Sequence, residues 1–178
     1  MNLRTSVITK LLPRCALTVL LAFAGCDNSP AKPSPPAMST ESTPVTEDIG
    51  ELGRRINLPV TPLAVRWQVQ RIGPSNSGGL PGPSTTRLRA LIKFADGDLQ
   101  TLIRGQTPLA AAGLVGEDYF ESWFPPSVKE MWASDPATGK YRIKTPLYDA
   151  GLFAKASYRI GTFFVTSAGE VCLTLSSM

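Results

Sequence analysis

Three acidic side chains that lie close together are the first candidates for chemistry in this sequence. Glu117, Asp118 and Glu121 fall within one short segment, and helical spacing would place Glu117 and Glu121 on the same face. Paired carboxylates are what many glycan hydrolases use as general acid and general base or nucleophile. A solvated helix face has the same appearance, and we favour that interpretation.

The absence of histidine excludes most other catalytic arrangements. The chain of 178 residues contains none, so it lacks Ser-His-Asp and Cys-His sites, histidine-ligated zinc and the commonest general base at neutral pH. Asp96-Gly97-Asp98 begins like a calcium loop, but Thr107 stands where such a loop needs a glutamate. We therefore predict no catalytic residue, no metal site and no cofactor, and we expect that the protein is not an enzyme.

Aromatic side chains are concentrated between residues 119 and 132. Rigid aromatic side chains often anchor a protein partner, and exposed rings can stack on sugars. Helices that pack on a sheet also need bulky side chains between the two layers, which is the commoner reason for such a cluster. Both interpretations stay open, and the candidate partner-binding residues are Tyr119, Trp123, Phe124 and Trp132.

Two predicted strands precede this segment. Residues 63–70 alternate apolar and polar side chains, and residues 86–94 place Leu88, Ala90, Ile92 and Phe94 on one face. The stretch 73–84 between them holds four glycines and three prolines, which predicts a long surface loop. Such a loop is a second candidate contact surface.

Helices are expected next. Leu99, Leu102 and Ile103 form one apolar face of a helix that Asp96 or Asp98 would cap and Gly105 would end. Residues 116–124 suggest a second short helix. A third would begin after Pro125-Pro126, where the spacing of Ser127 and Glu130 matches a reciprocal capping box.

Three strands are predicted at the C-terminal end, at residues 141–144, 158–166 and 170–175, with a hairpin turn at 167–169. Cys172 would be a buried strand residue rather than a reactive thiol. The resulting fold class is α+β. It consists of a mostly antiparallel sheet of about five strands, with two or three short helices inserted between the second and third strands.

The N-terminus has the features of an export signal. Residues 1–14 carry three positive charges and no negative one, and an apolar run too short to span a bilayer follows. The run ends in Leu21-Ala22-Phe23-Ala24-Gly25-Cys26, which resembles the lipobox of bacterial lipoproteins in its small residues before a cysteine. The resemblance implies cleavage after residue 25 and lipidation of Cys26.

The resemblance also indicates a location. Attached acyl chains would hold the protein in a membrane of the cell envelope. Asp27 resembles the residue associated with retention at the inner membrane in enterobacterial lipoproteins, so an inner-membrane position that faces the periplasm is favoured over the outer membrane.

The predicted domain organisation has three parts: a signal peptide at residues 1–25, a lipidated and flexible spacer at 26–57, and one α+β domain at 58–178. The spacer is rich in Pro, Ser and Thr, and we assign it no core. Within it, Ile49, Leu52 and Ile56 suggest a short amphipathic turn.

Charge argues against a nucleic-acid partner. Three of the 18 basic residues lie in the predicted signal peptide, which leaves 15 against 14 acidic residues. We expect an envelope lipoprotein that binds another protein, either as an accessory subunit or as an inhibitor or immunity-type protein. The alternatives are a carboxylate-dependent enzyme that acts on the cell wall or on glycans, and a module that binds a glycan or small ligand.

Lipidation of Cys26 is directly testable. Expressed in a Gram-negative host, the protein should appear in the membrane fraction with a diacylglyceryl group on an N-terminal Cys26, and the Cys26→Ser form should move to the soluble fraction. The mass of the mature N-terminus and membrane fractionation measure both effects. An unmodified N-terminus at another position would contradict the prediction and indicate a secreted soluble protein.

Overall fold

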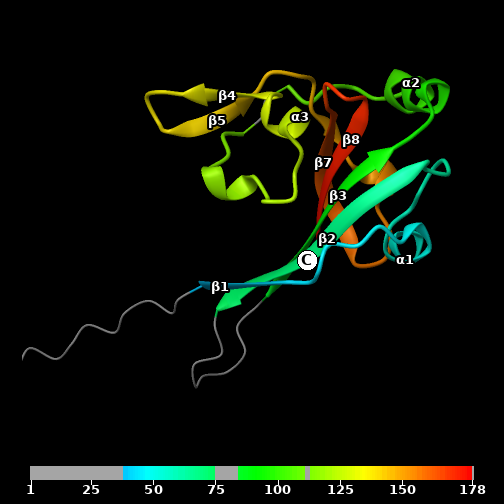
Figure 1. The fold of residues 1–178 in the computed structure, drawn as a ribbon, viewed down its shortest axis with the longest axis horizontal. Helices are drawn as coiled ribbons and strands as arrows, with labels where there is room; N and C mark the ends of the chain where they lie inside the picture. The colour runs from blue at the N-terminus through cyan, green and yellow to red at the C-terminus, as the bar shows by residue number, and fades with distance from the viewer. Residues whose placement is uncertain (1–37, 75–83, 111–112, 178) are drawn as a thin grey trace, which may run out of the picture. The chain divides into compact units, whose positions relative to one another are not determined.

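Six strands form one antiparallel sheet in the computed structural model, which describes residues 38–74, 84–110 and 113–177 (Figure 1). Their order across the sheet is β1-β2-β3-β8-β7-β6. The strands are β1 Met38–Ser42, β2 Ala64–Pro74, β3 Thr85–Lys93, β6 Tyr148–Asp149, β7 Tyr158–Val165 and β8 Glu170–Ser177. The predicted α+β class with a mostly antiparallel sheet is confirmed.

One face of the sheet carries the main hydrophobic core. Alternate positions of the central strands point into it, as the period of two requires, and helices α1 Ile49–Arg55 and α2 Asp96–Arg104 lie on this side (Figure 1). The short 3-10 helix η2, Gly151–Phe153, completes the cover. Fully buried residues of this core include Trp67, Leu88, Ile92, Leu173 and Leu175 from the strands and Leu52, Ile56 and Phe153 from the covering segments.

The opposite face is covered by the segment 115–147, which we call the insertion. It contains the 3-10 helix η1 Glu117–Tyr119, the helix α3 Pro126–Lys129, and a separate two-stranded hairpin of β4 Trp132–Asp135 and β5 Lys140–Ile143. Val128 and Trp132 of the insertion are buried against Leu91, Phe164 and Cys172 of the sheet. The molecule therefore has a second core, on the face where sequence alternation alone predicts solvent.

The N-terminal boundary of the domain differs from the prediction. Residues 38–57 are not a spacer, because β1 pairs along β2 and α1 inserts Leu52 and Ile56 into the main core. Asp48 caps α1 by accepting a hydrogen bond from the backbone N–H of Glu51 at 2.8 Å. The predicted start at residue 58 is therefore wrong. A polar edge strand gains its stability from backbone pairing, which composition does not reveal.

Two predicted helix caps are also wrong. Ala95, not Asp96 or Asp98, is the N-cap residue of α2, and its side chain makes no capping bond; both aspartates lie in the first turn. Pro125 is the N-cap residue of α3, so Ser127 lies inside the helix and forms no capping box. The helix expected over 116–124 is only the single turn η1.

The strands predicted at the C-terminal end agree more closely with the structure than the helix caps do. β7 and β8 form the predicted hairpin, in which Gly169 adopts a φ of 72° that favours glycine. The strand predicted at 141–144 exists as β5, but it pairs with β4, a strand that sequence analysis missed, and not with the main sheet. No helix within the described ranges is long and apolar enough to cross a membrane.

Gly161 allows β7 to approach β8 closely, which gives a stability prediction. A Cβ at this position would lie 2.0 Å from the carbonyl oxygen of Thr174 and 2.9 Å from the Cα of Leu175. Gly161→Ala should therefore lower the free energy of unfolding by at least about 2 kcal/mol, in the range of overpacked cores. Urea unfolding followed by tryptophan fluorescence measures this loss.

Gly97→Ala is the matched control for this change. Nothing lies within 4 Å of a Cβ at Gly97, and alanine favours the helix that contains it. The control should be as stable as the parent protein or more stable. Equal unfolding midpoints for both variants would contradict the packing argument.

Candidate functional site

A buried arginine joins the insertion to the second face of the sheet. Arg89 of β3 is only 2% exposed, and its Nη1 donates hydrogen bonds to the Tyr119 carbonyl oxygen and to a carboxylate oxygen of Glu121. Its guanidinium group also lies 4.8 Å from the centre of the Tyr119 ring, within the range of a cation–π interaction. The carbonyl group and the ring belong to Tyr119 and the carboxylate belongs to Glu121, so two residues of the insertion satisfy Arg89.

Glutamine side chains of β2 extend this network. Gln70 donates to the same carboxylate oxygen of Glu121 at 2.8 Å, so two strands hold one side chain. Gln68 accepts a hydrogen bond from the Trp123 indole N–H at 3.1 Å and donates to the backbone carbonyl of Thr43 at 2.7 Å. The side chains that alternation predicts to face water are therefore used to hold the insertion.

Burial changes the acid–base properties of three groups in this layer. Burial, and secondarily the charge of Arg87, lowers the pKa of the Arg89 guanidinium. Burial raises the pKa of the Tyr119 hydroxyl, and it raises the pKa of the Cys172 thiol to about 12. Cys172 is thus protonated at neutral pH, consistent with the predicted buried strand residue.

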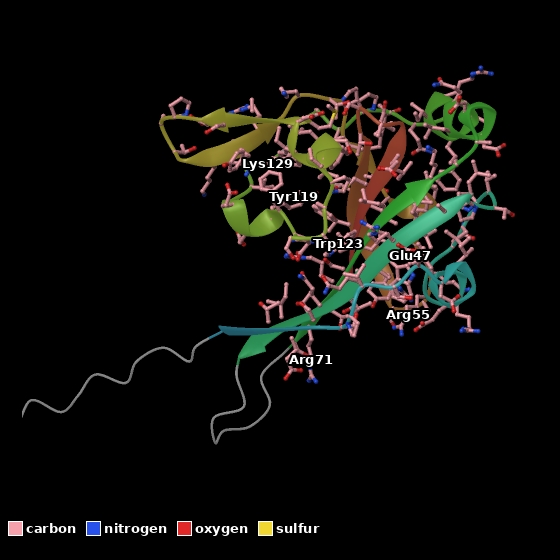
Figure 2. All side chains as sticks on the ribbon, in the orientation of Figure 1. Glu47, Arg55, Arg71, Tyr119, Trp123 and Lys129 are labelled. Atoms are coloured by element: carbon pink, nitrogen blue, oxygen red, sulfur yellow. The ribbon has the colours of Figure 1, made fainter. Side chains whose placement is uncertain are left out.

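The predicted aromatic residues do come together. Trp132 is 7% exposed, and its ring lies 5.0 Å from Tyr119 and 5.8 Å from Phe164. Trp123 and Phe124 are half-buried and contact each other edge to face at 4.5 Å between ring centres. The Trp123 side chain extends from the insertion towards β2 (Figure 2). The cluster mainly fills the layer between insertion and sheet.

One edge of the aromatic cluster borders an open hollow of about 610 Å³, which we call the apolar groove. Its apolar lining consists of Phe120, Phe124, Pro125 and Pro126. Its charged lining consists of Glu117, Glu121, Lys129 and Glu130. Of the four candidate partner-binding residues, Phe124 lines the groove, whereas Trp132 is covered.

A second hollow, of about 300 Å³, lies where η1 meets the strands β3 and β8; we call it the arginine pocket. Arg87 and Arg89 line it from β3, and Thr174 and Ser176 line it from β8. Gly116, Asp118 and Tyr119 contribute the insertion side. Neither arginine was predicted as a site residue, because Arg87 and Arg89 occupy the polar positions of their strand, which alternation predicts to face solvent.

The acidic cluster is divided among different roles. Glu117 is exposed and pairs with Lys129 at 2.8 Å, and this contact lowers the pKa of the Glu117 carboxyl group. Glu121 is bound to Arg89 and Gln70, whereas Asp118 lies on the rim of the arginine pocket. The single turn η1 ends at Tyr119, so Glu121 lies beyond it and does not share a helical face with Glu117.

Two further predicted sites, the lipidation site and most of the loop before β3, lie outside the residues that the structure describes. Cys26 and residues 75–83 of the loop predicted at 73–84 lie outside the described residues. Among the residues that the structure describes, no group of three or more His, Cys, Asp or Glu side chains could hold a metal ion.

Comparison with known proteins yields no relative: no family model, no curated protein and no solved structure matches this chain.

Removal of the Glu121 carboxylate should destabilise the protein strongly. Glu121→Ala leaves the charge of Arg89 buried without its ionic partner, and the loss of one member of a buried pair costs about 3 kcal/mol or more. Chemical denaturation measures the loss. Glu117→Ala is the matched control, since its pair with Lys129 is exposed and should leave the unfolding midpoint unchanged. Equal effects of the two substitutions would contradict the assignment.

Proposed function

We propose that this protein is a membrane-anchored lipoprotein of the cell envelope that binds another protein through the apolar groove. The groove is the observation that carries the proposal, because it combines an apolar floor with a charged rim. The anchor at Cys26 rests on the sequence of the N-terminus.

The charge of the groove indicates the chemistry of the partner. Three carboxylates and one ammonium group line it. The Glu130 carboxylate accepts a hydrogen bond from Ser167 at 3.0 Å and has no basic partner within the described ranges. A partner segment with an apolar anchor flanked by Lys or Arg would fill the floor and complement the rim.

The rigidity of the groove supports the same proposal. Phe120 and Phe124, which line its floor, also contact the buried aromatic cluster through Tyr119. Glu121 is fixed by Arg89 and Gln70. Binding to a surface that is already ordered costs less conformational entropy than binding to a mobile one.

The two alternative functions, a carboxylate-dependent hydrolase and a glycan-binding module, gain less support from this arrangement. A carboxylate-dependent hydrolase needs a general acid with a raised pKa, whereas Lys129 lowers the pKa of Glu117, and Glu121 is committed to Arg89. A glycan-binding module needs neighbouring exposed rings, and Trp132, one of the candidate residues, is buried.

Site-specific photocrosslinking in the native envelope tests the proposal. A photoreactive amino acid that replaces Lys129, an exposed residue of the groove, should give a discrete crosslinked species with a partner protein. The same amino acid at Gln100, exposed on α2, is the control and should not. The double substitution Glu117→Lys and Glu130→Lys should abolish the species, because it reverses two charges of the rim.

A charge reversal at Glu41, exposed on β1, should leave the crosslink intact. No crosslink at position 129, or a crosslink that survives reversal of Glu117 and Glu130, would overturn the proposed groove interaction.

A further inference from the structure

The arginine pocket presents an ordered set of hydrogen-bond donors. Arg87 and Arg89 occupy alternate positions of β3, so their side chains leave the same face of the sheet. The register of β3 with β8 places Ser176 directly opposite Arg87 and Thr174 directly opposite Arg89. Two guanidinium groups and two hydroxyl groups therefore form a compact array at the base of the insertion.

The positive charge of this array is only partly balanced. Arg89 is paired with Glu121, which lies outside the lining of the pocket. Arg87 forms no ion pair with any residue of the described ranges, and its charge already lowers the pKa of Arg89. Asp118 is the one acidic residue that lines the pocket, and it is exposed at the rim.

Arg89 also has a donor left over. A guanidinium group offers five N–H donors, and Nη1 makes both bonds to the insertion. The Nε–H of this buried side chain has no acceptor among the described residues. Buried donors are almost always satisfied in folded proteins, so the unpaired Nε–H is consistent with an acceptor bound at this site.

We propose that the arginine pocket is a binding site for a carboxylate group. The planar guanidinium group matches a carboxylate through paired N–H donors. The hydroxyl group of Ser176, which is directly across the strand pair from Arg87, supplies a further donor beside it. A volume of about 300 Å³ suits a small group rather than a large ligand. Asp118 at the rim lowers the net positive charge of the pocket, so charge favours a dianion over a singly charged carboxylate less than two unopposed arginines would.

The carboxylate has two conceivable sources, a free small acid or an Asp or Glu side chain of another protein. Titration of the isotope-labelled Cys26→Ser protein, followed by backbone amide NMR, separates them with two probes. Sodium acetate represents the free acid, and a capped peptide, acetyl-Ala-Glu-Ala-amide, represents the side chain. Saturable shifts at the amides of Gly116, Thr174 and Ser176 are expected with at least one probe. Inorganic phosphate serves as the comparison.

Three variants make the result specific. Arg87→Gln should weaken binding at least tenfold, and it should fold normally because Arg87 makes no ion pair within the described ranges. Asp118→Asn should strengthen binding severalfold, because it removes the repelling charge. Arg66→Gln, on the same face of the sheet but paired with Glu47 and outside the pocket, should change nothing.

Four results would overturn the proposal. They are the absence of saturable shifts at these amides with both carboxylates, tighter binding of phosphate than of either carboxylate, equal weakening by Arg87→Gln and Arg66→Gln, and no strengthening by Asp118→Asn. The groove interaction proposed above involves different side chains, so each proposal can fail without the other.

Discussion

The position of the insertion depends on one buried charge. Arg89 stands in the middle of a central strand, where a guanidinium group that is shielded from water needs a carboxylate and further acceptors nearby. Glu121, the Tyr119 carbonyl and the Tyr119 ring supply them. Apolar contacts alone would tolerate several placements of an aromatic-rich segment, but any displacement here would leave a buried charge without its partner. The ion pair therefore selects one placement of the insertion on the sheet.

The turn that satisfies Arg89 also separates the two candidate sites. Glu117, Phe120 and Glu121 line the apolar groove, whereas Gly116, Asp118 and Tyr119 line the arginine pocket. Neighbouring residues of η1 and its flanks are thus directed to different hollows. A partner in the groove and a carboxylate in the pocket would contact the same short segment, and both would contact a segment held by Arg89.

Local patterns in the sequence predicted the main core but not its second layer. The alternation in β2 and β3 and the apolar positions of α2 indicate which sheet face is buried, so these elements followed from the residue order. The contribution of α1 to this core was not predicted, because its residues were assigned to the spacer. Arg89, Gln68 and Gln70 occupy the other positions of the same strands, and a strand covered by a distant segment has the same local pattern as one that faces water. Long-range contacts distinguish the two cases, such as the pairing of Arg89 with Glu121, 32 residues later.

The same limitation explains the misplaced domain boundary, and its correction narrows the choice of partner. β1 is joined to β2 by backbone pairing, and four of its five residues are polar, so the strand resembles a spacer in composition. With the fold extending to Met38, only residues 27–37 separate Cys26 from the sheet. A fully extended chain of this length reaches no further than roughly 40 Å. If Cys26 is lipidated as proposed, β1 lies within this reach of the anchor, so a partner for the groove has to approach the same surface.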